Sequence, residues 1–191
     1  MKIVLATKSL CRQEAFKFLG LDFIAEGSNV DEYFDGRPDN PKELVKHLAQ
    51  LKAESVAKNH SEGIVIGFDS IGWFNNEILE KPSSKEEAFN RLKLLSGNNH
   101  RFYTGIFMID TATGKSISRV IKTELFMREL TEPEINKYLE QDPNFNIYAL
   151  GYDPLSYYSS TFVKKIEGSY NNFTRGIPLE VMVEMLKEFE K

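Results

Sequence analysis

Residues 64–68 form an uninterrupted apolar run, Ile-Val-Ile-Gly-Phe. An apolar run of this length is typical of a strand buried on both faces, in the centre of a sheet. The apolar segment Ile3–Ala6 reads as a second buried strand, because it is too short for the core of a signal peptide and leads directly into polar residues. The chain is therefore expected to build its core around a sheet.

Helix signals separate the expected strands. The clearest segment is 41–58, where Asn40 is a typical N-cap, Pro41 suits the first helical position, and Leu44 and Leu48 follow at helical spacing. The other expected helices cover 9–19, 84–95, 131–139 and 178–189. Further strands are expected at 22–26, 71–74, 77–79, 101–110 and 116–127. Asn75-Asn76 is typical of a tight hairpin turn, and the mixture of elements predicts an α/β or α+β fold with a mixed sheet.

The composition excludes several classes of protein. The chain has 24 Lys and Arg residues against 28 Asp and Glu residues, a net charge of −4. It is therefore a poor candidate for a nucleic-acid coat, which needs clustered cations. Its single cysteine, Cys11, excludes an intrachain disulfide, and no stretch approaches the ~20 apolar residues of a membrane span. We expect no nucleic-acid partner, no membrane partner and a cytoplasmic location.

Two cations follow the first strand. Lys8 and Arg12 lie in the first turn of an expected helix that Thr7 or Ser9 can cap, where the helix dipole disfavours positive charge. A bound anion would remove this conflict. The alternative is that both side chains are simply solvated.

Charged residues also stand at positions expected to be buried. Lys52 lies on the same side of its helix as Leu48, so its ammonium either extends to water or points at a phosphate in a cleft. Asp69 directly follows the run 64–68, at the expected carboxyl end of a strand, where it either takes part in ligand chemistry or caps a turn together with Ser70.

Taken together, the charged residues indicate a type of ligand. Arg12, Lys52 and Lys81 could neutralise a polyphosphate, while Glu32 and Asp69 could hold a hard divalent cation. Such a set is suited to breaking a phosphoanhydride, where catalysis is mainly positioning and charge neutralisation. Spacing in the sequence does not establish that the groups converge.

Several segments resemble the motifs of one enzyme family. Leu5–Arg12, Leu-Ala-Thr-Lys-Ser-Leu-Cys-Arg, is similar to its opening Leu-Ala-Ser-x-Ser-Pro-Arg-Arg, and Leu95–Gly105 is very close to its Leu-Ser-Gly-x-x-His-x-Val-x-Thr-Gly. The other similar segments, in the same order as in the family, are Asn29–Glu32, Leu51–Ala57, Val65–Ser70, Leu79–Pro82, Ile166–Asn172 and Gly176–Leu179. Through them the chain resembles the Maf family of nucleoside triphosphate pyrophosphatases, relatives of the inosine triphosphatase fold.

The resemblance implies a reaction and a set of site residues. The reaction converts a nucleoside triphosphate to the monophosphate and diphosphate, with a divalent cation, Mg²⁺ or Mn²⁺, as cofactor. Asp69 would be the proton acceptor, and Glu32 and Asp69 the cation ligands. The positions implied to bind substrate are Thr7, Ser9, Cys11, Arg12, Lys52, Ser70 and Lys81. The implied fold is a single domain, 1–191, with an elongated mixed sheet flanked by helices in two lobes that share a central cleft, commonly as a homodimer.

The chain departs from the family at positions tied to the choice of base. Cys11, Ser70 and Ser156 stand where the family has arginine, threonine and glutamine, so we expect a shifted or broadened base preference. Aromatic residues nearby could stack on a base instead, although core or dimer packing is the simpler interpretation; they are Tyr148, Tyr152, Tyr157 and Tyr158. His100, in the well-matched segment, is expected to shape a loop rather than to transfer protons.

A second class of function is compatible with these departures. The weakly matched stretch 146–156 and the missing Pro-Arg pair at Leu10 and Cys11 would also suit a protein that binds a nucleotide or a protein partner without hydrolysis, in growth or division control. Metal-dependent release of diphosphate separates the two interpretations.

Overall fold

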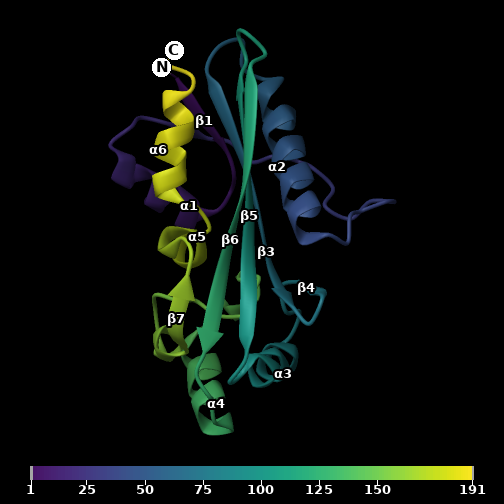
Figure 1. The fold of residues 1–191 in the computed structure, drawn as a ribbon, viewed down its shortest axis with the longest axis vertical. Coiled ribbons are helices and arrows are strands. Elements are labelled where there is room, and N and C mark those ends of the chain that lie inside the picture. The colour runs from purple at the N-terminus through teal and green to yellow at the C-terminus, as the bar shows by residue number, and fades with distance from the viewer. Residues whose placement is uncertain (1, 191) are drawn as a thin grey trace. The chain divides into compact units, whose positions relative to one another are not determined.

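The computed structural model describes residues 2–190, which divide into two compact units. Unit 1 consists of the chain up to Ser70, Tyr103–Ile121 and the chain from Arg175 on, and unit 2 of Ile71–Phe102 and Lys122–Thr174. The chain therefore passes from one unit to the other several times. Figure 1 colours the chain by residue number, so its course can be followed there.

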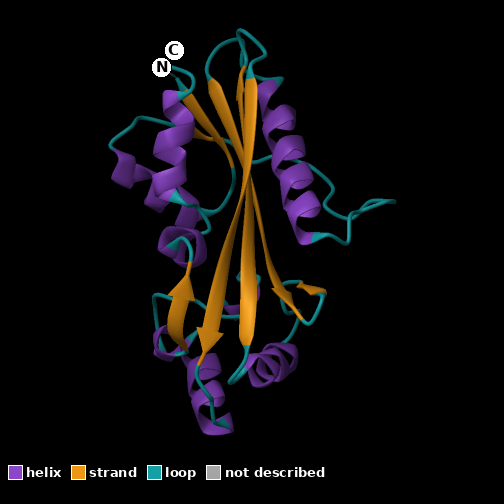
Figure 2. Ribbon diagram, viewed as in Figure 1, coloured by secondary structure: helices purple, strands orange, loops and turns teal. Residues whose placement is uncertain are grey.

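The described residues form a seven-stranded mixed sheet with the order β2-β1-β3-β5-β6-β7, in which β4 pairs with β3 (Figure 2). The strands are β1 (Ile3–Ala6), β2 (Ile24–Ala25), β3 (Ile64–Phe74), β4 (Glu77–Leu79), β5 (Asn99–Asp110), β6 (Ser116–Met127) and β7 (Val163–Glu167). Strand β1 runs parallel to β2 and β3, whereas the pairs β3–β4 and β6–β7 are antiparallel. The expected mixed sheet is confirmed.

The helices carry the predicted caps. They are α1 (Leu10–Phe16), α2 (Pro41–Ala57), α3 (Lys85–Leu95), α4 (Glu132–Gln141), α5 (Tyr170–Arg175) and α6 (Leu179–Lys187), with 3-10 turns η1 (Lys17–Leu19), η2 (Phe145–Ile147) and η3 (Tyr158–Thr161). The Asn40 side chain accepts hydrogen bonds at the start of α2, and Ser84 caps α3. The prediction missed α5 and gave no bounds for β7, and the segment 9–19 is a helix only as far as Phe16 before it tightens into η1.

In unit 1, helices cover both faces of the strands. Phe16 of α1 and Met182 of α6 share a buried cluster with Ile66 and Phe68 of β3, whereas Ala49 and Ala53 of α2 belong to a separate buried cluster with Val65. Figure 1 accordingly shows α2 on one side of these strands and α1 and α6 on the other. Strand β3 is thus buried on both faces, as its apolar run predicts.

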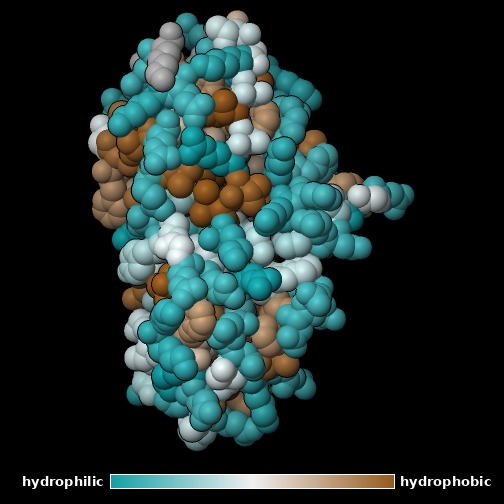
Figure 3. All heavy atoms as spheres, viewed as in Figure 1, coloured by the Kyte–Doolittle hydropathy of each residue, from teal (hydrophilic) through white to brown (hydrophobic). Residues whose placement is uncertain are grey.

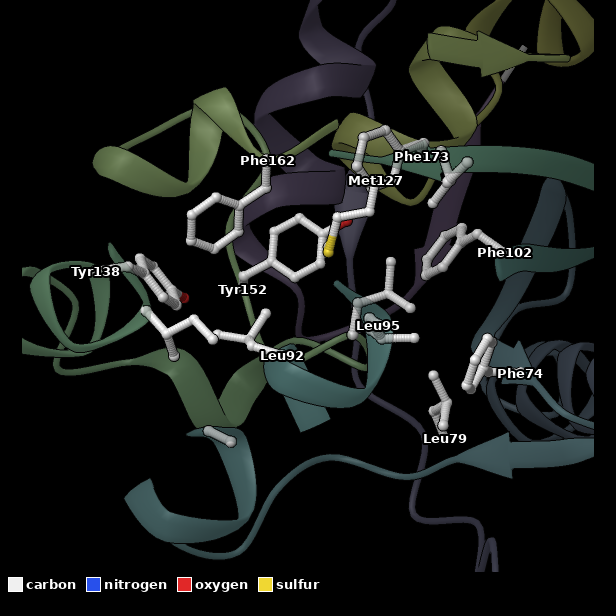
Figure 4. Close-up of a cluster of buried hydrophobic side chains, with 14 of the residues drawn as sticks. Phe74, Leu79, Leu92, Leu95, Phe102, Met127, Tyr138, Tyr152, Phe162 and Phe173 are labelled. Carbon is white, nitrogen blue, oxygen red and sulfur yellow. The ribbon is translucent and has the colours of Figure 1, made fainter. Parts of the chain in front are cut away.

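Unit 2 has its own core, drawn in Figure 4. Leu92 and Leu95 of α3 and Tyr138 of α4 pack there against aromatic side chains. The labelled aromatic residues of this cluster are Phe74, Phe102, Tyr138, Tyr152, Phe162 and Phe173.

Two expectations about β3 need correction. The run 64–68 does not end before Asp69 but continues as one strand of 11 residues to Phe74, so the expected strand 71–74 is part of it. Asp69 therefore lies inside a strand, neither at its carboxyl end nor in a turn with Ser70. The predicted hairpin to β4 is confirmed, because Asn75 and Asn76 both have positive φ, 49° and 63°, as a two-residue type I′ turn requires.

Candidate functional site

Lys52 of α2 joins the two predicted carboxylates in unit 1. Its Nζ lies 2.7 Å from Asp69 Oδ1 and 2.6 Å from Glu32 Oε1. The Lys52 side chain is only 13% exposed. Of the two interpretations of this lysine, extension to water is therefore wrong, because the ammonium points inward onto the carboxylates.

Asp69 is an unusual group for the middle of a strand. It is 5% exposed, and its second oxygen, Oδ2, is buried without a hydrogen-bond partner among the described residues. Burial raises the pKa of the Asp69 carboxyl above its usual value; the Lys52 ammonium opposes this shift, and the Glu32 carboxylate adds to it. One oxygen of Asp69 is thus held by Lys52, and the other is able to accept a proton or to bind a cation.

Close packing of α2 on the strand brings Lys52 to Asp69. A Cβ atom at Gly67, two residues before Asp69 on the same face of β3, would lie 2.1 Å from the Ala49 carbonyl oxygen and 2.7 Å from the Ala53 nitrogen. Gly105 allows a similar approach, since a Cβ there would lie 2.1 Å from the Val45 carbonyl oxygen. Glycine at these positions lets the helix backbone approach the sheet closely enough for Lys52 to bond Asp69.

Arg12 forms a second polar cluster on the other face of β3. Its Nε donates to the Gly176 carbonyl oxygen at 2.9 Å, one terminal nitrogen donates to Ser70 Oγ at 2.7 Å, and the other lies 3.4 Å from the Phe68 carbonyl oxygen. Ser70 Oγ in turn lies 2.7 Å from Thr104 Oγ1, whose residue is fully buried. Burial lowers the pKa of the Arg12 guanidinium, although the charges of Asp69 and Glu32 oppose this shift.

The sequence analysis missed two partners in this second cluster. Thr104 lies in the well-matched segment Leu95–Gly105, which could have drawn attention to it. Gly176 contributes only a backbone carbonyl, so no side-chain pattern could have identified it.

The turn before α1 is ordered by its own side chains. Thr7 Oγ1 accepts from the Ser9 backbone N–H at 3.1 Å, and Ser9 Oγ accepts from the Arg12 backbone N–H at 3.4 Å. Ser9 is therefore the N-cap, one of the two predicted candidates. Cys11, next to Arg12, is exposed.

The remaining predicted positions belong to unit 2. Lys81 and Ser156 are exposed there. Tyr152 is 1% exposed and packs against Phe162 and Phe173, so its predicted alternative role of stacking on a base is wrong. Tyr157 is 46% exposed.

His100 lies inside β5 and not in a loop, which corrects its expected role. It is 1% exposed, its Nδ1 has no hydrogen-bond partner among residues 2–190, and its Nε2 lies 3.4 Å from the Tyr152 hydroxyl. Burial lowers the pKa of His100 to about 4. It is thus a neutral residue of the unit 2 interior at neutral pH.

The residues around Lys52 fit a magnesium-type cation better than a metal that needs a full protein cage. Within the described part of the chain, no three or more His, Cys, Asp or Glu residues gather as a metal site. Mg²⁺, however, commonly takes one or two carboxylates and completes its shell with water and substrate phosphates. Glu32 and Asp69 already converge on the Lys52 ammonium, and Asp69 Oδ2 has no hydrogen-bond partner among the described residues.

Comparison with known proteins identifies the family. The sequence profile described as "Maf-like protein" matches residues 2–189. The chain belongs to the Maf family. A relative from Thermoanaerobacter sp. (strain X514), named dTTP/UTP pyrophosphatase, is 38% identical over 197 residues, covering 100% of this chain and 98% of the relative. A protein of the same name from Bacillus anthracis is 37% identical over 194 residues, with 98% and 95% coverage.

Solved structures agree on the fold. The Ham1 protein of Staphylococcus aureus superposes with a TM-score of 0.56 at 20% identity, over 100% of both chains. At this level of identity the likeness shows the fold alone, which is the Maf and inosine triphosphatase-like arrangement expected from the sequence. Among the helices that the structure describes, none is long and apolar enough to cross a membrane.

Proposed function

We propose that this Maf family member is a nucleoside triphosphate pyrophosphatase, which cleaves the bond between the α- and β-phosphates and releases a nucleoside monophosphate and diphosphate. The observation that carries this proposal is the cluster of Lys52, Asp69 and Glu32, found in a chain that matches named dTTP/UTP pyrophosphatases over its full length. It provides a positive charge, a buried carboxylate and a second carboxylate at one place.

Asp69 is the proposed proton acceptor for the attacking water. A base is most effective when its pKa lies near the operating pH, and burial shifts the pKa of Asp69 in that direction. Since Oδ1 accepts a hydrogen bond from Lys52, Oδ2 is the oxygen placed to take the proton. Lys52 holds the carboxylate in the free protein and supplies charge for the leaving diphosphate.

Glu32 and Asp69 are the proposed ligands of a divalent cation, Mg²⁺ or Mn²⁺. When bound there, this cation would neutralise charge on the triphosphate. Two carboxylates suffice for this role because phosphate and water oxygens complete the shell of such a cation.

The other substrate contacts are proposals from the family resemblance. They comprise Thr7, Ser9, Cys11, Arg12, Ser70 and Lys81. Arg12 is the least simple of them, because three of its five N–H groups already donate within the protein. We propose that it acts mainly by fixing the segment before α1 beside Asp69, with Ser9 and Thr7 in the same turn.

Assembly and location complete the proposal. We propose a homodimer, supported by large apolar side chains exposed in unit 1, which are Leu10, Phe18, Leu21 and Ile24. On the face drawn in Figure 3, hydrophobic atoms gather in separate patches among hydrophilic ones. A cytoplasmic location agrees with the single free cysteine, Cys11.

A nucleotide screen tests the reaction. The protein is incubated with UTP, dTTP, CTP, GTP, ATP and several modified nucleotides in the presence of Mg²⁺ or Mn²⁺, and diphosphate and orthophosphate are quantified separately. We expect diphosphate from at least one nucleotide, and none after chelation of the cation. Folded, metal-supplied protein that binds nucleotides in calorimetry but releases no diphosphate would instead identify a binding protein.

A further inference from the structure

We infer that Lys52 is a built-in counter-ion, whose ammonium occupies the place of the divalent cation in the free protein and must leave when that cation binds. This inference rests on the proposed function for the identity of the site, but it concerns the protein before any nucleotide arrives. It predicts that Lys52 lowers the affinity of the free protein for the cation, and that cation binding releases the Lys52 ammonium.

The geometry shows one cationic group bridging two carboxylates. Lys52 Nζ lies 2.6 Å from Glu32 Oε1 and 2.7 Å from Asp69 Oδ1, distances typical of charge-assisted hydrogen bonds. An ammonium bonded to both groups takes the central position between their oxygens. A cation that uses the same two oxygens needs that position, so the two cannot be present together in this arrangement.

In the free protein, the Lys52 ammonium competes strongly with a divalent cation for the two carboxylates. The Lys52 side chain is 13% exposed and that of Asp69 7% exposed, so water screens their attraction less than it would at the surface. Without Lys52, the carboxylates of Asp69 and Glu32 would repel each other, because an oxygen of each lies within 2.7 Å of the same Lys52 nitrogen. A divalent cation would then relieve a repulsion that the ammonium relieves now.

A second arrangement must be distinguished from this one. Asp69 Oδ2 has no hydrogen-bond partner among the described residues, so a cation could bind there while Lys52 kept Oδ1. In that case Lys52 would stay in place when the cation binds. Both arrangements allow Lys52 to weaken cation binding through charge repulsion, but only displacement frees its amine.

Two measurements without nucleotide test whether the cation displaces Lys52. The first titrates Mn²⁺ into wild-type protein and the Lys52→Met variant and follows free Mn²⁺ by electron paramagnetic resonance. We expect the variant to bind Mn²⁺ at least ~10-fold more tightly. Lys93→Met is the matched control, because Lys93 pairs with Glu132 at 2.6 Å but both side chains are 60% exposed. Its affinity for Mn²⁺ should equal that of the wild type.

The second measurement follows the Lys52 amine itself in the wild-type protein. Acetic anhydride labels lysines in the presence and absence of Mn²⁺, and mass spectrometry quantifies each site, with Lys93 as the internal reference. We expect labelling of Lys52 relative to Lys93 to increase at least ~5-fold with Mn²⁺, since a paired and buried amine is protected. This readout remains decisive if Lys52→Met fails to fold.

The outcomes separate this inference from the proposed function. Unchanged or reduced labelling of Lys52 at saturating Mn²⁺ would overturn it, as would equal or weaker Mn²⁺ binding by folded Lys52→Met. Neither measurement involves turnover, so a protein that fails the nucleotide screen could still pass both, and an active enzyme could fail both.

Discussion

Asp69 and Ser70 are adjacent in strand β3, yet they bond to different helices on opposite faces of the sheet. Asp69 bonds to Lys52 of α2, whereas Ser70 bonds to Arg12 of α1. Successive side chains of a strand point to opposite faces, so this division follows from position in the strand. The residues that the sequence brought into one set are therefore divided. Lys52, Asp69 and Glu32 meet on one face of β3 and Arg12 lies on the other, whereas Lys81 belongs to unit 2.

This division assigns different consequences to mutations in the two clusters. Lys52, Asp69 and Glu32 hold charge that a substrate and a cation can use. Arg12, Ser70 and Thr104 are bonded mainly to one another and to the backbone. Changes in the first cluster should alter turnover, whereas changes in the second should lower stability in addition to any effect on substrate binding.

Asp69→Asn should lower kcat by ~10² or more, the usual scale for loss of a general base. The variant keeps the size of the side chain and removes the charge, so circular dichroism and the melting temperature should change little. The measurement is the rate of diphosphate release under saturating nucleotide. Asp22→Asn, an exposed aspartate of the same unit, should retain full activity. If Asp69→Asn retained most of its activity, the site assignment would be wrong.

Arg12→Lys should destabilise the protein by about 1–3 kcal/mol, because a lysine cannot reproduce the fork that reaches Gly176 and Ser70 together. Urea unfolding measures this loss. Arg101→Lys is the control, since Arg101 is 45% exposed and 3.7 Å from Glu124. A variant of unchanged stability with a raised KM would mean that Arg12 serves the phosphates directly.

Gly67→Ala should disrupt the contact between α2 and the sheet. The added Cβ would lie 2.1 Å from the Ala49 carbonyl oxygen, which is helix backbone and cannot rotate away. We expect a loss of about 1–3 kcal/mol in stability, together with a large loss of activity as the displaced helix carries Lys52 out of the site. Gly27→Ala is the control, because the three atoms nearest to its Cβ all belong to the flexible Lys8 side chain and not to backbone. Equal stability of the two variants would contradict this account of the packing.

How far the sequence could predict this site depends on how local each signal is. Some signals are local patterns, namely the caps Asn40 and Ser84 and the apolar run that begins at Ile64. The elements that they predict, α2, α3 and β3, are present. The end of β3 was misjudged because Asp69 and Ser70 resemble a turn, while their partners, Lys52 and Arg12, come from distant segments. Convergence of Lys52 on Asp69 depends on close helix packing at Gly67, which no pattern of charges reveals.

Lowering the pH from 7 to 5 should destabilise the folded protein through His100. Burial holds the pKa of His100 at about 4 in the folded chain, against 6.5 for an unperturbed histidine. Between these values the unfolded chain binds a proton that the folded chain does not. The contribution of His100 to the free energy of unfolding is therefore fully present above pH 6.5 and declines as the pH falls towards 4. The contribution is about 2 kcal/mol between pH 7 and 5.

Urea unfolding of wild-type protein and His100→Gln at both pH values measures this contribution. The variant should lose clearly less stability than the wild type between pH 7 and 5. Because all other titrating groups are shared, the difference between the two proteins reports His100. Equal losses would mean that His100 is not held neutral in the folded state.

The base preference should be shifted or broadened relative to the named dTTP/UTP pyrophosphatases. Cys11, Ser70 and Ser156 are smaller than the arginine, threonine and glutamine of the family pattern, and two of the changes remove groups able to make several hydrogen bonds. A site rejects a wrong base mainly through polar groups that the mismatch leaves unpaired, so their loss weakens discrimination. Tyr152 cannot compensate by stacking, because it is buried in the unit 2 core. Values of kcat/KM for UTP, dTTP, CTP, GTP, ATP and modified nucleotides measure the preference. A preference for UTP or dTTP above ~100-fold over every other base would show that recognition does not depend on those side chains.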